Sequence, residues 1–140
     1  MEEVANEWRL MKGYAANLEE VTVANTDYRR VVYTAKDTQL VLMSLKPGEE
    51  IGNEVHQLAQ FIRVEQGECT AILNNGETEY ELTKDWAIIV PAGNWHNIVN
   101  TGEGDLKLYT LYSPPNHKEG TIQATKADEY EEEFDGTTTE

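Results

Sequence analysis

The chain has 140 residues, 39% of them hydrophobic, and its 26 acidic and 11 basic side chains give a net charge of -15. This length fits one domain with a buried core, and the charge disfavours nucleic acid and anionic membranes as partners. Cys69 is the single cysteine, so an internal disulfide and a thiolate cluster are excluded and a metal would need imidazole, carboxylate or amide ligands. Because no stretch resembles a signal peptide or a membrane span, we expect a cytoplasmic protein.

Residues 1–21 are expected to form an N-terminal arm, either as a short helix or as an irregular segment. Val4, Trp8 and Met11 are spaced by four and three residues, which weakly indicates one helical face. We interpret Trp8 as a packing anchor rather than a ligand contact.

Residues 22–113 alternate in polarity over short segments that are separated by turns, as in an all-β domain. The Asn75-Gly76 pair is the strongest hairpin signal. Many short strands without intervening helices must close or double over to protect their edges, so we expect a jelly-roll barrel. The expected strands are Tyr28–Thr34, Gln39–Leu45, Glu54–His56, Gln60–Glu65, Glu68–Leu73, Thr78–Leu82, Trp86–Val90, His96–Asn100 and Lys107–Tyr112.

Residues 114–140 are expected to form an acidic C-terminal tail. The last 26 residues hold eight acidic and two basic side chains, which favours a solvated segment. Within it we expect an extended piece through Thr121 and Ile122 and a short helical turn near Ala127–Phe134.

Four polar side chains of the barrel region are the candidate metal ligands. Glu54 and His56 are two residues apart, so on a strand both point to the same face. Antiparallel pairing can bring Gln60, on the next strand, and His96, after a Pro-x-Gly turn, to the same place. Two imidazoles and one carboxylate with open positions favour Fe(II), with Mn, Ni, Co and Zn as alternatives.

The spacing of these residues resembles the first motif of the cupin superfamily, Gly-x5-His-x-His-x3-4-Glu-x6-Gly. It is matched by Gly48, Glu54, His56, Gln60 and Gly67. The chain departs from the motif in having Glu where the family has its first His, and Gln where the family has Glu. The total charge of the four side chains is therefore the same as in the family.

The second family motif, Gly-x5-Pro-x-Gly-x2-His-x3-Asn, is matched by Asp85, Pro91, Gly93, His96 and Asn100. Asp replaces the first Gly, a change that the left-handed backbone region tolerates. The resemblance implies a small single-domain cupin with a jelly-roll barrel, one divalent metal held by the motif side chains, and a homodimer.

Several other side chains have expected structural positions. Arg63 is expected at the surface, on the opposite face of the strand from Gln60, and Cys69 is expected to be an inert core thiol. Trp86 and Trp95 are expected to pack between the sheets or at a dimer interface.

Tyr109 and Tyr112 lie on opposite faces of the last strand, so one of them should line the interior, and the sequence leaves open which one. A phenol beside a metal could act in acid–base chemistry or in orienting a ligand. His117 follows the barrel among polar residues and is expected to be exposed rather than to be a further ligand.

The sequence leaves three functions open. The first is a metal-dependent enzyme that acts on a small organic substrate by oxygenation or isomerisation, which only the resemblance implies. The second is a barrel that binds a sugar or another metabolite without catalysis. The third is a structural dimer whose barrel is filled by bulky side chains against His56 and His96.

Overall fold

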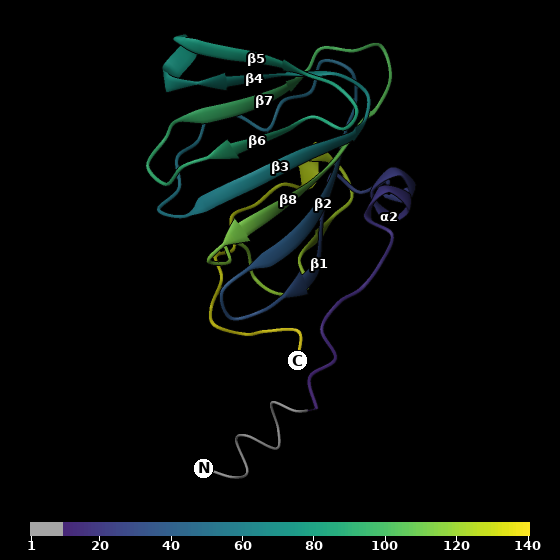
Figure 1. The fold of residues 1–140 in the computed structure, drawn as a ribbon, viewed down its shortest axis with the longest axis vertical. Coiled ribbons are helices and arrows are strands. Elements are labelled where there is room, and N and C mark those ends of the chain that lie inside the picture. The colour runs from purple at the N-terminus through teal and green to yellow at the C-terminus, as the bar shows by residue number, and fades with distance from the viewer. Residues whose placement is uncertain (1–9) are drawn as a thin grey trace.

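The computed structural model describes residues 10–140, which form a two-layered antiparallel β structure (Figure 1). Trp8 and Val4 lie outside the described residues. The elements are α2 (Leu18–Ala24), β1 (Arg29–Thr34), β2 (Gln39–Leu45), β3 (Ala59–Gln66), β4 (Cys69–Leu73), η1 (Asn74–Gly76), β5 (Thr78–Leu82), β6 (Ala87–Val90), β7 (His96–Asn100), β8 (Leu106–Ser113), β9 (Ile122–Gln123) and η2 (Lys126–Asp128).

Two sheets form the layers of the barrel, as the jelly-roll prediction requires. The larger sheet has the strand order β6-β3-β8-β2-β1-β9, and the smaller has the order β5-β4-β7. The predicted hairpin at Asn75-Gly76 is confirmed, because β4 and β5 pair on either side of it and Asn75 has a positive φ of 55°. Asp85 also has a positive φ, of 74°, as expected for its place in the second motif.

The segment between β2 and β3 extends the smaller sheet along β7. The Ile51 N–H donates to the Ile98 carbonyl at 3.0 Å, and Glu54 forms a β-bridge with His96. The expected strand Glu54–His56 is therefore wrong in extent: only Glu54 pairs, and residues 55–58 are irregular. Three residues are too few to pair along their length when the chain must also turn into β3.

Alternation along the strands places one main core between the two sheets. On β2, Val41 and Met43 are fully buried in this core. The neighbouring residues Leu40 and Leu42 face the other side, where they form a second cluster with Tyr109. Burial of apolar area on both faces of the larger sheet stabilises the fold.

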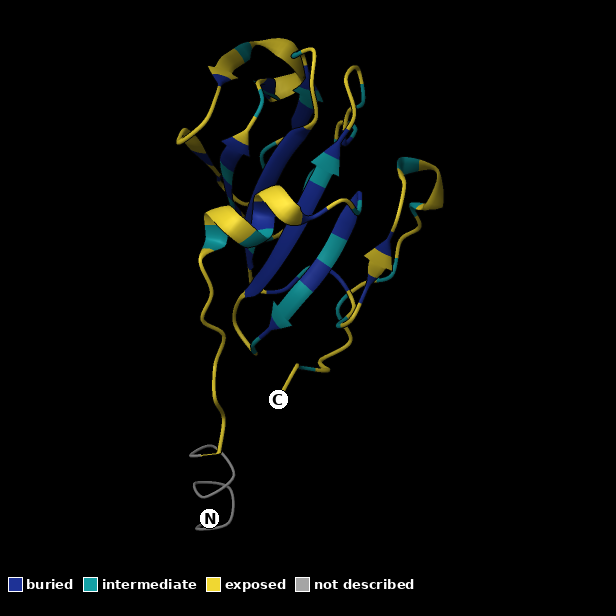
Figure 2. Ribbon diagram, turned by 90° about the vertical axis from the view of Figure 1, so that its right-hand side faces the viewer, coloured by how far each residue is buried: buried dark blue, intermediate teal, exposed yellow. Residues whose placement is uncertain are grey.

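Helix α2 covers the outer face of the larger sheet (Figure 2). Asn17 caps the helix by accepting a hydrogen bond from the Glu20 N–H, and Leu18 and Val21 pack on the outer cluster. The expectation that period-two structure begins at residue 22 is wrong, because this helix continues to Ala24. Among residues 10–140, no helix is both long and apolar enough to cross a membrane.

The acidic segment 114–140 packs along the barrel and is not a detached solvated tail. Strand β9 pairs with β1 through Ile122 opposite Arg30 and Gln123 opposite Arg29. The Thr139 N–H donates to the Thr34 carbonyl at 2.9 Å. Most acidic side chains of this segment point outward, whereas its backbone is hydrogen-bonded to β1. The net charge of the segment does not indicate these backbone contacts.

The two tryptophans of the second motif region are not buried between the sheets. Trp86 is 56% exposed and Trp95 is 43% exposed. Both lie in the turns that flank β6, outside the strand positions that face the core. The first of their two expected locations is therefore wrong.

Candidate metal centre

Backbone pairing sets the separation of Glu54 and His96. The Glu54 N–H donates to the His96 carbonyl, and the His96 N–H donates to the Glu54 carbonyl, each at 2.9 Å. Directly opposed residues of an antiparallel pair point to the same face. Their side chains therefore emerge together at the start of β7.

His56 is held near this pair by the turn between β6 and β7. The Gly93 N–H donates to the His56 carbonyl at 2.7 Å. Gly93 has a φ of +81°, a backbone conformation that glycine adopts without strain. The Pro-x-Gly turn thus connects the two histidine-bearing loops.

The side chains of Glu54, His56 and His96 converge, and one ligand atom of each lies within 4.8 Å of the others. Glu54 Oε1 lies 3.2 Å from His56 Nε2 and 3.7 Å from His96 Nε2. The two imidazole rings are 5.4 Å apart, centre to centre. The side chains of Glu54 and His56 are 28% and 15% exposed, so the cluster lies at an opening of the barrel.

Both imidazoles present a free nitrogen to this cluster. His96 Nδ1 lies 2.9 Å from the Asn94 carbonyl, which can only accept, so Nδ1 carries the proton. The Nε2 atoms of His56 and His96 are buried and make no hydrogen bond of regular geometry; both face Glu54 Oε1, at 3.2 and 3.7 Å. For His96, a buried Nε2 that faces a carboxylate while Nδ1 is held by a carbonyl is the arrangement of a metal-ligating histidine.

Glu54 and His96 each favour the charged form of the other. Burial raises the pKa of the Glu54 carboxyl, but the adjacent His56 and His96 imidazoles outweigh this effect and lower its pKa to about 2. Burial lowers the pKa of His96, but Glu54 and the Asn94 carbonyl raise it above its ordinary value. Glu54 is therefore a carboxylate near neutral pH, as a metal ligand must be.

Gln60 is on the inner face of β3 and is 2% exposed. Its Nε2 donates to Thr110 Oγ1 at 2.9 Å, which identifies its Oε1 as the free acceptor. This oxygen is buried and has no hydrogen-bond partner. Gln60 pairs with Tyr112 in the sheet, so it belongs to the row of side chains next to the cluster.

The structure also shows which tyrosine of β8 faces the interior. Tyr112 is fully buried in the main core, and its ring meets the His56 ring edge-on at 5.9 Å. Tyr109 faces outward and packs on Phe61. Arg63, on the same outer face, is 38% exposed and pairs with the exposed Asp85 and the buried Glu65.

His117 is buried, so the expectation that it is exposed is wrong. Its ring meets the Tyr112 ring edge-on at 5.1 Å, and its Nε2 lies 3.4 Å from the Tyr112 hydroxyl. Gln39 causes this placement, because its side chain binds both the N–H and the carbonyl of residue 117, at 2.9 and 2.7 Å. Burial and the nearby Arg29 lower the pKa of His117 to about 3.

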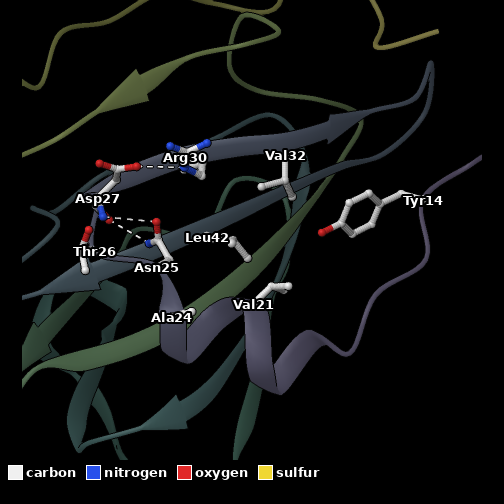
Figure 3. A pocket seen from close by; sticks show the side chains of 9 residues that line it. All are labelled: Tyr14, Val21, Ala24, Asn25, Thr26, Asp27, Arg30, Val32 and Leu42. Atoms are coloured by element: carbon white, nitrogen blue, oxygen red, sulfur yellow. Dashed lines mark hydrogen bonds and ion pairs between the residues drawn. The ribbon is translucent and has the colours of Figure 1, made fainter.

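A separate hollow of about 410 Å³ lies on the outer side of the larger sheet, beneath α2 (Figure 3). Val32 and Leu42 line it, and Arg30 lies at one end. Three of its polar side chains are already paired: Arg30 Nε lies 2.8 Å from Asp27 Oδ2, and the Asn25 side chain binds the backbone of residue 27. The interior cluster, with its unpartnered buried atoms, is therefore the stronger candidate site.

An antiparallel jelly roll with a carboxylate and two imidazoles converging at one opening defines a class of small barrel proteins with a potential metal site. The family model described as Cupin domain matches residues 41–112, which include Glu54, His56 and His96. The chain belongs to the cupin family, and the resemblance seen in its two motifs is confirmed.

Three similar proteins are informative. YrkC, an uncharacterised protein of Bacillus subtilis, is 44% identical over 124 residues, which cover 84% of this chain and 66% of YrkC. The chain thus spans just under two thirds of the length of that relative. The crystal structure of BH2720 from Bacillus halodurans is 42% identical, with a TM-score of 0.81 over 84% of this chain and 92% of BH2720.

A more distant structure supports the fold alone. The RmlC-like cupin MJ0764 of Methanocaldococcus jannaschii, described as a double-stranded β-helix, has a TM-score of 0.59 at 16% identity, over 75% of this chain and 92% of that one.

Proposed function

We propose that this protein is a metal-binding cupin that acts on a small organic molecule in its barrel. Glu54, His56 and His96 would hold one divalent transition metal, with Gln60 Oε1 as a fourth, weaker ligand. The proposed reaction is a metal-assisted oxygenation or isomerisation.

The observation that carries this proposal is the set of buried atoms that lack partners. Gln60 Oε1 is buried without a hydrogen bond, and His56 Nε2 and His96 Nε2 are buried and face only Glu54 Oε1. A buried acceptor without a partner costs about 1–3 kcal/mol, and a metal ion would engage all three atoms together with Glu54. Two imidazoles and a carboxylate suit Fe(II), Mn, Co, Ni or Zn and are a poor set for Mg or Ca.

Tyr112 packs its ring beside the proposed site, edge-on to the His56 ring, and its hydroxyl lies 3.4 Å from His117 Nε2. Burial raises the pKa of its hydroxyl, so the phenol keeps its proton near neutral pH. When bound, a divalent ion polarises the oxygen groups of its ligand and lowers the pKa of a hydroxyl. A ligand held beside His56 would contact the Tyr112 ring, which would restrict its orientation.

The test is metal content after reconstitution with Fe(II), Mn, Co, Ni and Zn separately, measured by elemental analysis after gel filtration. We expect close to one ion per chain in the wild type and loss of the ion in His56→Ala and His96→Ala. His117→Gln is the matched control, because it removes the third histidine and should retain the ion. No retained ion in the wild type, or retention in both alanine variants, would refute the proposal.

A binding role without catalysis is the second candidate. It is favoured by Gln60, because a neutral amide oxygen binds a metal more weakly than the carboxylate found in the family motif. This role predicts that a ligand raises the melting temperature in the presence of a chelator.

A further inference from the structure

Arg29 is a buried cation on the inner side of β1. It is 3% exposed, and it lies opposite Met43 of β2, which is fully buried in the core between the sheets. Charged side chains are rarely buried this far unless they are paired or have a function. Neither motif includes this residue, and only its inward position on the strand identifies it.

The guanidinium of Arg29 lies over the Tyr28 ring, with Cζ 5.2 Å from the ring centre, and among the described residues its polar contacts are made by Nη1 alone. Its Nη1 donates to Gln123 Oε1 at 2.8 Å and lies 3.3 Å from Glu129 Oε2. Its Nε is buried and has no hydrogen-bond partner, and within residues 10–140 no hydrogen bond from Nη2 is found. The edge formed by Nε and Nη2 is the one that binds a carboxylate through two parallel hydrogen bonds.

Arg29 is linked by contacts to the segment that carries Glu54. Its partner Glu129 also pairs with Lys126, whose Nζ lies 2.9 Å from Glu129 Oε1. The same Nζ donates to the Ile51 carbonyl at 2.9 Å. Ile51 precedes Glu54 by three residues, so these contacts connect Arg29 to the segment of the candidate metal centre.

The balance of charges near Arg29 would favour an anion once a divalent ion is bound. Arg29 and Lys126 are balanced by Glu129 and Glu54, and Lys126 Nζ lies 2.9 Å from Glu129 Oε1. A divalent cation on the Glu54 cluster would leave an excess positive charge around these side chains, of which Arg29 is only 3% exposed. An anionic ligand would compensate this excess, and a neutral ligand would not.

We propose that the small molecule bound in the barrel carries a carboxylate that is anchored by the Nε/Nη2 edge of Arg29. Its other end, a hydroxyl or a carbonyl, would then face Glu54, His56 and His96. The assignment of that second end rests on the proposed metal site, whereas the carboxylate contact stands on Arg29 alone. The ligand class is therefore a small hydroxy or oxo acid.

The experiment is calorimetric titration with lactate, malate and 2-oxoglutarate, using lactamide as the neutral counterpart of lactate. Each is measured on the reconstituted protein and again with a chelator present. We expect at least one acid to bind saturably, lactamide to bind at least about tenfold more weakly, and Arg29→Lys to weaken the acid at least about tenfold. Arg29→Lys keeps the charge that pairs with Glu129 and removes only the forked edge.

A second variant guards against misfolding. Arg29→Gln combined with Glu129→Gln removes both charges of this pair, so no unpaired charge is left at the buried position 29; Lys126, which also loses Glu129 as a partner, is 33% exposed and can be solvated. It should show the same loss of acid binding, with metal content and the far-ultraviolet circular dichroism spectrum unchanged.

The outcomes separate this inference from the proposed metal site. Equal binding of lactate and lactamide, unchanged acid binding in both Arg29 variants, or binding of no acid by a protein that retains its ion would overturn the carboxylate anchor alone. Acid binding that depends on Arg29 in a protein that retains no ion would support the anchor and refute the metal site.

Discussion

Replacing His117 with Gln should change how the stability of the protein depends on pH. The imidazole is buried against Tyr112, and burial lowers its pKa to about 3. In the unfolded chain the same group titrates near its ordinary value of 6.5. Acid therefore protonates His117 in the unfolded state before it does so in the folded state, which favours unfolding.

The size of the effect follows from these two values. The stabilising contribution is fully present above pH 6.5 and is lost as the pH falls toward 3. Between about pH 7.5 and about pH 5, the wild type should lose about 2 kcal/mol more of its unfolding free energy than the Gln variant. This result requires only that the folded protein leaves His117 neutral at pH 5.

Urea unfolding followed by circular dichroism at several pH values, with a chelator present, measures this difference. The variant should fold, because Gln39 binds the backbone of residue 117 and not its side chain. His96→Gln is the control: the pKa of His96 is raised by Glu54 and the Asn94 carbonyl despite burial, so its contribution is present at low pH and is lost as the pH rises. Parallel stability curves for the wild type and His117→Gln would refute the reasoning.

Three further substitutions or modifications test the packing. Gly67→Ala should lower the unfolding free energy by about 1 to 3 kcal/mol, because Gly67 has a φ of +88° and an added Cβ would lie 2.8 Å from the Asp105 carbonyl oxygen. The control is Gly104→Ala, where nothing lies within 4 Å of the added Cβ, and it should change the unfolding free energy by less than about 0.5 kcal/mol. Equal effects of the two substitutions in urea unfolding would contradict this prediction. Met43→Ala should cost about 2 to 5 kcal/mol in the same assay, because the side chain is fully buried. Burial raises the pKa of the Cys69 thiol to about 12, so a thiol reagent near pH 8 should react with it only after unfolding, and rapid labelling of the folded protein would count against this burial.

Much of the barrel is predictable from the sequence because turn residues bound its strands. The expected strands at 39–45, 78–82 and 96–100 agree with β2, β5 and β7, although β2 is buried on both faces and β5 is mostly exposed, so the turns on either side mark these strands better than one-sided burial does. The strand at 54–56 was less predictable. It is too short for alternation to distinguish a paired strand from a loop held by one bridge.

The spacing of residues in the sequence was enough to predict the three candidate metal ligands, but not the tyrosine that lies beside them. Glu54, His56 and His96 come together as expected, because Glu54 pairs with His96 and the Pro-x-Gly turn before His96 holds the backbone of His56. The choice between Tyr109 and Tyr112 needed the register of β3 with β8, in which Gln60 lies opposite Tyr112. No local pattern contains that register.

Contacts between distant segments account for the features that the sequence did not indicate. His117 is buried because Gln39, on a strand far earlier in the chain, binds its backbone. Arg29 is oriented by Gln123 and Glu129 from the C-terminal segment. The composition of that segment indicates solvation and contains no information about which of its polar groups turn inward.

The bridge between Glu54 and His96 has a consequence for the order of folding events. The two residues are far apart in the chain, so their pairing requires closure of a long loop and forms late. A metal ion that needs both side chains cannot be captured by a chain in which β7 has not yet joined this segment. Such an ion would therefore slow unfolding of the finished barrel while leaving the rate of folding nearly unchanged.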